Sequence, residues 1–443
     1  MDRRCFKLSA AGGLLLAGLS AAWGHGGEPQ VLTITHPAQF PGEAWAITDN
    51  QGIFAVGPEG SRWLCEDAVA PSAGVRAAIP VGAEGTRWLV ATDLGLYVTE
   101  DGGCSFSPAE GALADHAPLG IWPAPSADPA QLGRDALIAT ATFDAYNDVY
   151  WTEDGGIRWQ AAGLDVAGRI YSLVRGDTPE TAELVYVTHA EGAARSDDGG
   201  RTFSPIALGP EDLSPLPIEL SVIAIDRGDP DTVYAVLQRF PTSILLMSAD
   251  RGASWAAIAD LDEYPRGMIT TASGQALLAI PFAGELRRDQ AEGPWRLDPP
   301  QIPLLGCLTE GPEGDLWACS NVFFGGPWVM AQSEDLGRQW QPVLSQFNSV
   351  TPTWGCPEDS RSALACAEFC PGQGAGASGC AITPDAGTPD AGAPSEDGGT
   401  VDGEDEGRSR GGGCDLAGGA GGPWWWILIG LGWWRASRRI TPE

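Results

Sequence analysis

The stretch "TEDGGIRW" at residues 152–159 is one of five copies of the pattern Ser/Thr-x-Asp-x-Gly-x-x-Trp/Phe. The five copies are called the boxes, and the other four are "TEDGGCSF" at 99–106, "SDDGGRTF" at 196–203, "SADRGASW" at 248–255 and "SEDLGRQW" at 333–340. Successive boxes begin 53, 44, 52 and 85 residues apart, counted between residues 99, 152, 196, 248 and 333. This spacing indicates a repeated structural unit, and the last gap has room for two units.

Two weaker copies complete the repeat, "RRDQAEGPW" at 287–295 in the long gap and "VGPEGSRW" at 56–63 before the first box. Around each copy the pattern is strand, Gly-rich turn, strand, short turn, strand, box and strand, most clearly over residues 75–106. Seven four-stranded units with a period of about 45 residues predict an all-β fold, a seven-bladed β-propeller of antiparallel blades over residues 31–344. We assign residues 25–355 to this domain.

Each box is expected to form the turn between the third and fourth strands of its blade. A carboxylate there can accept backbone N–H groups that the sheet leaves unpaired, glycine supplies a positive φ, and the aromatic ring fills the space between blades. The residues expected in these structural roles are Asp101, Gly103, Phe106, Asp154, Gly156, Trp159, Asp198, Gly200, Phe203, Asp250, Gly252, Trp255, Asp335, Gly337 and Trp340. Because each aspartate belongs to its own turn, the series predicts neither a catalytic nor a metal site.

The boxes resemble the Asp box, or BNR repeat, and residues 31–344 resemble the Asp-box propellers of sialidases, sortilin-type receptors, xyloglucanases and photosystem II assembly factors. The resemblance implies the fold and leaves the activity open. A sialidase would need three clustered arginines, a Tyr/Glu pair, an Asp acid and an early Phe/Tyr-Arg-Ile-Pro motif. The nearest string, "GRIYS" at 168–172, lacks the proline and falls in the fourth blade.

Composition and the N-terminus indicate an exported protein. Residues 1–24 have a basic start, an apolar stretch and small residues near their end, as in a secretory signal peptide, and Arg3 and Arg4 resemble a twin-arginine pair. The formal charge of −32 argues against binding to nucleic acid or to anionic membrane surfaces, because both depend on basic patches. Disulfides persist in an oxidising compartment, so cysteine pairs are expected.

The C-terminal part of the chain has a different composition. A Cys-rich segment at 356–380 precedes a disordered acidic Gly/Pro/Asp-rich linker at 381–413. Residues 414–443 then combine a Gly-rich cysteine motif, a short apolar span with five tryptophans and a basic cluster, which resembles the MYXO-CTERM and GlyGly-CTERM sorting signals. The resemblance makes Cys414 the processed or lipidated residue and the membrane contact transient. A permanent transmembrane anchor is the alternative.

The remaining cysteines are expected to pair. Cys307 and Cys319 are equidistant from a turn near Glu313, which predicts a disulfide across the first two strands of the seventh blade. We interpret Cys356, Cys366, Cys370 and Cys380 as a small knot after the last blade and group Cys65 with Cys104, with pairing inside these groups left open. The four histidines show no metal-ligand spacing, so neither a metal nor a cofactor is expected.

Three arginines form the candidate ligand site. Superposed units place Arg76, Arg169 and Arg266 at the start of the innermost strand of the second, fourth and sixth blades, around the channel mouth on the face opposite the boxes. The neighbouring residues Tyr171, Tyr264, Asp262 and Glu263 would add aromatic rings and hydrogen-bond acceptors, as suits an acidic sugar. The alternative is that each arginine pairs with a local acid.

The sequence therefore favours an exported, monomeric, surface-displayed propeller that binds a glycan or a surface protein without catalysing a reaction. A sialidase-like or other glycoside hydrolase is the second reading, on analogy of fold alone. The third is an architectural envelope protein.

Overall fold

A computed structural model describes residues 30–367 apart from 115, 143–145, 207–218, 240–241, 301, 303–304, 323–324, 348–349 and 351–353. The predicted signal peptide, linker and sorting signal lie outside the described residues, as do Cys370, Cys380 and Cys414. Within the described part of the chain, no helix is long and apolar enough to span a membrane.

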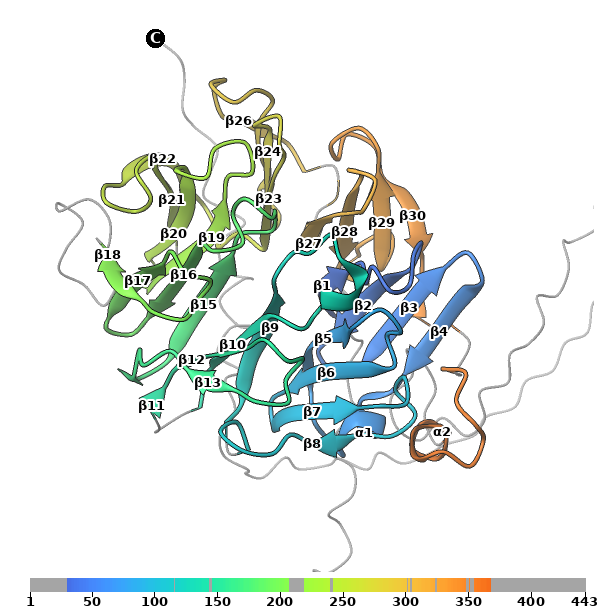
Figure 1. The fold of residues 1–443 in the computed structure, drawn as a ribbon. Coiled ribbons are helices and arrows are strands. Elements are labelled where there is room, and N and C mark those ends of the chain that lie inside the picture. The colour runs from blue at the N-terminus through green and yellow to red at the C-terminus, as the bar shows by residue number, and fades with distance from the viewer. Residues whose placement is uncertain are drawn as a thin grey trace, which may run out of the picture. The chain divides into compact units, whose positions relative to one another are not determined.

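Seven four-stranded antiparallel sheets form a ring, so the predicted seven-bladed all-β propeller is confirmed (Figure 1). Blades 1 to 3, each given from its inner to its outer strand, are β1 (Val31–Thr35), β2 (Ala44–Thr48), β3 (Ile53–Gly57) and β4 (Gly60–Leu64); β5 (Val75–Val81), β6 (Arg87–Thr92), β7 (Gly95–Thr99) and β8 (Ser107–Pro108); and β9 (Pro118–Pro123), β10 (Ala136–Thr140), β12 (Val149–Thr152) and β13 (Gln160–Ala161). Blade 3 also carries a two-stranded sheet of β11 (Tyr146–Asn147) and β14 (Val166–Ala167).

Blades 4 to 7 follow the same order: β15 (Ile170–Arg175), β16 (Val185–His189), β17 (Gly192–Ser196) and β18 (Ser204–Ile206); β19 (Glu219–Ile225), β20 (Val233–Arg239), β21 (Thr242–Ser248) and β22 (Ala256–Leu261); β23 (Gly267–Thr270), β24 (Ala276–Ile280), β25 (Gly284–Arg288) and β26 (Arg296–Asp298); and β27 (Leu305–Glu310), β28 (Leu316–Ser320), β29 (Met330–Ser333) and β30 (Gln341–Leu344). The described helices are α1 (Glu66–Val69), the 3-10 turn η1 (Pro129–Gln131) and α2 (Arg361–Cys366).

The strand directions define two faces of the ring. Because neighbouring strands are antiparallel, the inner strand of a blade ends on the same side as its third strand. The turns between the third and fourth strands therefore share one side with the ends of the inner strands, and this side is called the box face. The ring closes where β1 packs on β27 and β28 (Figure 1). Among the described residues, no strand is exchanged between blade 1 and blade 7.

Every box lies in the turn between the third and fourth strands of a blade, in blades 2, 3, 4, 5 and 7, and the two weaker copies take this place in blades 1 and 6. In blade 4, the Ser196 hydroxyl donates to Asp198 Oδ1 at 2.6 Å, and the same carboxylate accepts the backbone N–H groups of Arg201 and Thr202 at 3.0 and 2.9 Å. Gly200 has φ +89°, and a Cβ there would lie 2.7 Å from Leu137 of blade 3. The turn is thus closed by its own side chain and pressed against the preceding blade.

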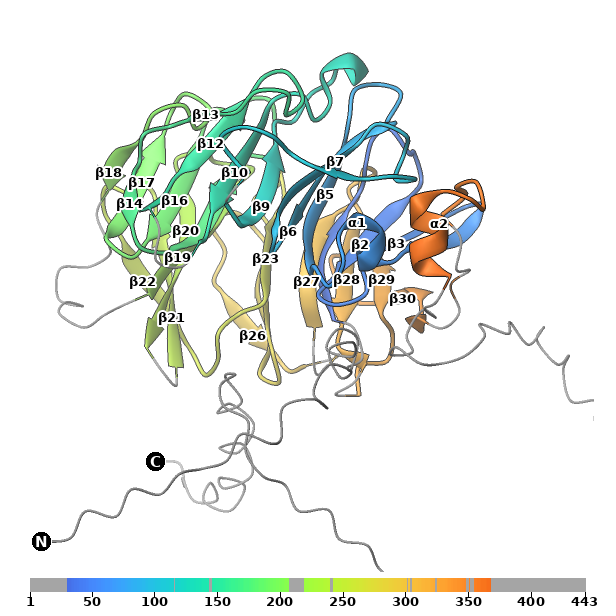
Figure 2. The ribbon, with the colours of Figure 1, turned by 90° about the horizontal axis from the view of Figure 1, so that it is seen from below.

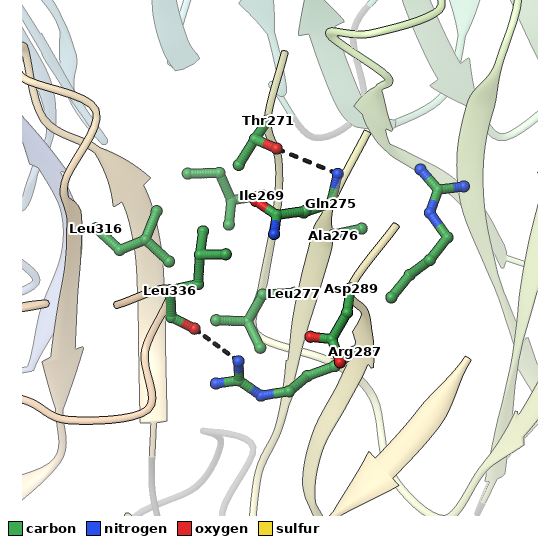
Figure 3. Close-up of a pocket in the computed structure, with 10 residues that line it drawn as sticks. Ile269, Thr271, Gln275, Ala276, Leu277, Arg287, Asp289, Leu316 and Leu336 are labelled. Atoms are coloured by element: carbon green, nitrogen blue, oxygen red, sulfur yellow. Dashed lines mark hydrogen bonds between the residues drawn. The ribbon is translucent and has the colours of Figure 1, made fainter. Parts of the chain in front are cut away.

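The boxes also receive hydrogen bonds from the preceding blades. The residue after each box aspartate has a positive φ in all five boxes. Its carbonyl accepts an arginine N–H across three of the blade junctions, from Arg87 to Gly155 at 2.9 Å, from Arg195 to Arg251 at 3.1 Å and from Arg287 to Leu336 at 2.6 Å. The last of these bonds is drawn in Figure 3. The box therefore stabilises the contact between blades as well as its own turn.

After β30, the described residues between 345 and 367 contact blades 1 and 2, and this part of the chain is called the strap. The ring of Phe347 packs on Phe54 of blade 1 with centroids 4.8 Å apart. Trp354 packs against both Trp45 and Trp88, with centroids 5.7 and 5.4 Å away, and its indole N–H donates to the box carbonyl of Gly102. Helix α2 packs beside α1 (Figure 2).

The disulfides correct the cysteine groups expected from the sequence. Cys65 pairs with Cys366 and Cys104 pairs with Cys356, so the strap is bonded to blades 1 and 2, and Cys356 and Cys366 do not pair within a separate knot. These partners are 301 and 252 residues apart, so spacing along the chain carries no sign of them. Cys307 and Cys319 are joined across β27 and β28.

We expect Asp198→Ala to lower the free energy of unfolding by about 1–2 kcal/mol, because two backbone donors lose their acceptor. Asp197→Ala is the matched control, since Asp197 is half exposed and pairs with Arg195 at the surface, and it should cost less than about 1 kcal/mol. Denaturant unfolding at pH 7 measures both values. Equal losses would contradict the role of the box carboxylate.

The stability that Asp198 contributes should depend on pH. Burial alone would raise the pKa of Asp198, but hydrogen bonds from Ser196 and Thr202 outweigh burial and hold the pKa below its ordinary value of 3.8. The stabilisation is therefore present above about pH 4 and is lost as the pH falls further. The difference in unfolding free energy between wild type and Asp198→Ala should narrow below that pH.

The disulfide between Cys65 and Cys366 in the strap should contribute more stability than the disulfide between Cys307 and Cys319. In the chain-entropy view a cross-link stabilises more when it closes a longer loop, and a native disulfide contributes about 2–5 kcal/mol. We expect the pair Cys65→Ser/Cys366→Ser to lower Tm further than the pair Cys307→Ser/Cys319→Ser, whose partners are only 12 residues apart. Thermal melts followed by circular dichroism compare the two. A larger loss in the second pair would contradict this expectation.

Candidate functional site

A cavity of about 690 Å³ occupies the channel between the inner strands, and it is called the channel cavity. Its wall is built mainly by the inner strands of blades 1 to 3, with Thr309 and Glu310 from blade 7 and Asp177 from the loop after β15. Most of these positions lie at or beyond the ends of the inner strands. The channel cavity therefore extends to the box face.

Prolines form part of the rim of the channel cavity on the box face. They are Pro37, Pro80, Pro123 and Pro125, at or just after the ends of β1, β5 and β9. The carbonyl of Pro80 accepts the Gln39 side-chain amide at 3.1 Å. Proline restricts φ and carries no N–H, so these positions have less backbone freedom and fewer backbone donors than other residues would give.

An arginine connects two acids at this mouth. Arg227, which follows β19 of blade 5, binds Asp177 of blade 4 at 2.6 Å and also pairs with Glu310 of blade 7. Its side chain is 22% exposed. The guanidinium therefore reaches past blade 6 and holds two wall carboxylates in place.

Two rings of the wall have different roles. Trp122 on β9 is half-buried and lines the channel cavity, where its indole can meet a ligand. His36 also lines the channel cavity, but burial lowers its pKa in spite of the nearby Asp315, and its ring packs edge-on against Trp317. Burial thus disfavours the charged form of His36, whereas Trp122 contributes an uncharged aromatic ring to the wall and also packs on the hydrophobic cluster of blades 3 and 4.

A second, smaller cavity of about 320 Å³ adjoins the channel cavity and is called the outer cleft. Ala124, Pro125 and Ser126 line both cavities. The rest of the outer cleft is formed by Gln131, Asp135 and Glu153. The two cavities thus share one wall, which belongs to the loop between β9 and β10.

The three arginines expected to surround one opening lie at the starts of their inner strands, and all three are exposed. Arg76 lines the channel cavity, whereas Arg169 and Arg266 are not part of its wall. Arg76 is close enough to Asp49 to lower its pKa, although burial raises that pKa overall. Arg266 acts in the same way on Glu263, whose pKa burial likewise raises.

The aromatic and acidic neighbours of these arginines lie apart from the channel cavity. Tyr171 is half-buried on β15. Tyr264 and Asp262 are exposed in the loop between β22 and β23. The channel cavity therefore brings together Arg76 with residues that were not in the predicted set, and the three-arginine site stays a prediction.

Two other features with polar groups, a small gap between blades 6 and 7 and the buried Glu66 of α1, lie outside the channel cavity. A gap of about 10 Å³ between blades 6 and 7 is bordered by Arg287 and Leu336, and it is too small for a ligand (Figure 3). At α1, burial, with the negative charges of Asp67, Asp49 and Asp93, raises the pKa of Glu66 to about 8. Among the described residues, no group of three His, Cys, Asp or Glu is placed to hold a metal ion.

Sequence reasoning missed Trp122, Asp177, Arg227 and Glu310. Asp177 and Arg227 each stand two residues after an inner strand, and Glu310 is the last residue of one. Superposition of the units at the ends of the inner strands would have placed Asp177, Arg227 and Glu310 on one face, but would not have shown that they pair.

No protein-family profile and no curated protein matches the chain. Solved structures do resemble it. An ancestral GH74 enzyme is 15% identical with a TM-score of 0.54, over 75% of this chain and 48% of the other, so this chain spans about half of that enzyme. The extracellular domain of a hybrid two-component system from B. thetaiotaomicron is 12% identical with a TM-score of 0.50, over 70% and 39% of the two chains.

A structure of YCF48 bound to D1 peptide is 13% identical, with a TM-score of 0.47 over 67% of this chain and 92% of the other. At these identities the likeness concerns the fold alone. The described residues of this chain form a seven-bladed β-propeller, as the comparisons and the sheet order both show.

Proposed function

We propose that this chain is an exported, non-catalytic propeller that binds a saccharide chain in the channel cavity, from the box face. The observation that carries the proposal is the channel cavity itself, about 690 Å³ in volume with four prolines in its lining. Small-molecule sites usually measure about 300–1,000 Å³ and combine apolar walls with a few placed polar groups. The walls here fit that description.

The lining of the channel cavity suits a saccharide ligand better than it suits a protein ligand with a flat surface. The half-buried indole of Trp122 offers an apolar face for a pyranose ring. Asp177 and Glu310, oriented by Arg227, offer carboxylate acceptors to sugar hydroxyls. A surface protein as ligand would need a projecting segment able to enter the same cavity.

A glycoside hydrolase is the second candidate, because two carboxylates, Asp177 and Glu310, face one cavity and a GH74 enzyme shares the fold. Glycosidases usually use a pair of carboxyl groups, one of them a protonated acid. In this chain one guanidinium, that of Arg227, engages both carboxylates. This pairing favours a binding role over hydrolysis.

Export rests on separate observations. The three disulfides are consistent with folding in an oxidising compartment. Display at the cell surface, through processing at Cys414, and the monomeric state remain predictions from the sequence.

The test is titration of the purified propeller with a saccharide panel, followed by tryptophan fluorescence and calorimetry. We expect Trp122→Ala to weaken binding about tenfold, equivalent to about 1.4 kcal/mol. Tyr146→Ala is the matched control, because Tyr146 is 65% exposed on β11 and does not line the channel cavity. The control should bind like wild type.

Product analysis on the same samples separates the two candidates. Binding without released sugar supports the non-catalytic reading, and released sugar that disappears in Glu310→Gln supports the hydrolase. A wild-type protein that binds no saccharide of the panel, or equal losses in the two aromatic variants, would contradict the proposal.

A further inference from the structure

We infer that the outer cleft is a second subsite for the same ligand, so that the ligand is an uncharged oligosaccharide long enough to occupy both cavities. The inference rests on the proposed saccharide binding and adds the length and charge of the ligand. Three features carry it: the shared wall, the orientation of the acids in the outer cleft, and the balance of charge around both cavities.

The shared wall is fixed in place. The loop between β9 and β10 carries η1, whose Asp128 accepts the Ala130 N–H at 3.0 Å, and its ends are tied by the bond from Ala124 N–H to Asp135 O at 2.8 Å. The N–H of Gly82 in blade 2 donates to Leu132 O at 2.7 Å. A ligand that leaves the channel cavity over Ala124 to Ser126 therefore meets a preformed surface rather than a mobile loop.

The acids of the outer cleft are held in defined orientations. Arg201 pairs with Glu153 and lies 3.6 Å from Asp135, which also binds Arg175 at 2.8 Å. The Arg201 guanidinium lies over the ring of Trp151, 5.1 Å from its centre. An ionised carboxylate has about four acceptor positions, so such pairing leaves acceptors for ligand hydroxyls.

The two cavities resemble each other chemically. Each has two wall carboxylates that share one arginine, Arg227 at the channel cavity and Arg201 at the outer cleft. The channel pair comes from blades 4 and 7, whereas both acids of the outer cleft belong to blade 3. A polymer of similar sugar units, placed across the shared wall, would meet the same kind of acceptors twice. This repetition favours an oligomer over a single small molecule.

The charge of the lining gives acidic ligands no advantage. Four acids line the two cavities, Asp177, Glu310, Asp135 and Glu153, and among the described lining residues Arg76 is the one arginine. The arginines bound to these acids bring the local charge near neutrality but leave no excess of positive charge. A neutral chain of hydroxyl donors therefore fits, whereas a polyanion would gain no net electrostatic attraction from the two linings.

Occupation of both cavities should appear as a dependence on chain length. The probes are β-1,4-linked oligomers of glucose, mannose and N-acetylglucosamine, two to six units long, with galacturonate oligomers as the anionic arm. For the sugar that binds, we expect at least a tenfold gain in affinity between two and six units, because the second subsite is reached by a ligand already held at the first.

Substitutions of residues in the outer cleft test whether the gain in affinity with ligand length comes from this cleft. Glu153→Ala and, separately, Gln131→Ala should remove most of the gain for the six-unit ligand and leave the two-unit affinity unchanged. Glu100→Ala is the matched control, since Glu100 holds the same position in the box of blade 2 and pairs with Arg87 away from both linings. It should bind all lengths like wild type, and Tm values confirm that each variant folds.

The outcomes are distinct. Equal affinity for two and six units, or a loss in Glu153→Ala that is the same at every length, overturns the second subsite and leaves the channel cavity as the whole site. Tighter binding of galacturonate than of neutral oligomers overturns the uncharged ligand and supports the three-arginine site instead. A protein that binds no oligomer overturns the proposed function, and with it this inference.

Discussion

The hydrogen bonds of a box carboxylate to its own turn are the interaction on which the ring depends. In blade 4 the Asp198 carboxylate fixes the turn by accepting two backbone N–H groups. In three other boxes, the carbonyl of the residue after the aspartate accepts a hydrogen bond from an arginine of the preceding blade. A sheet of four strands cannot cover its own faces, so stability comes from the contacts between blades. The box links local turn geometry to these contacts, which explains why one chain repeats it.

The junction between blade 1 and blade 7, where the ring closes, is held in a different way from the junctions at the boxes. Within the described part of the chain, the inner strands β1 and β27 pack against each other and no strand is exchanged between the first and last blades, so side-chain packing holds these two strands together. The strap adds Phe347 and Trp354 to the aromatic core of blades 1 and 2. Binding in a channel benefits from this closure, because the wall of the channel cavity is shared by several blades and holds its shape only if the ring stays shut.

The repeat made the fold predictable, and the site was not predictable in the same way. Box spacing predicted seven blades and the position of each turn, because these depend on local sequence. The partners of Cys65 and Cys104 depend on where the chain goes after the last blade, and no local pattern carries that information. The meeting of Asp177, Arg227 and Glu310 likewise arises from three separate blades, each of which contributes one ordinary charged residue at the end of a strand.

The strap also decides how the propeller would carry mechanical load. A pull on the chain beyond residue 367 enters the domain at Cys366, where the covalent bond to Cys65 passes it to the outer edge of blade 1. The bond between Cys356 and Cys104 shares the force with blade 2. Tension is thus divided between two sheets instead of unzipping β30 from its neighbour.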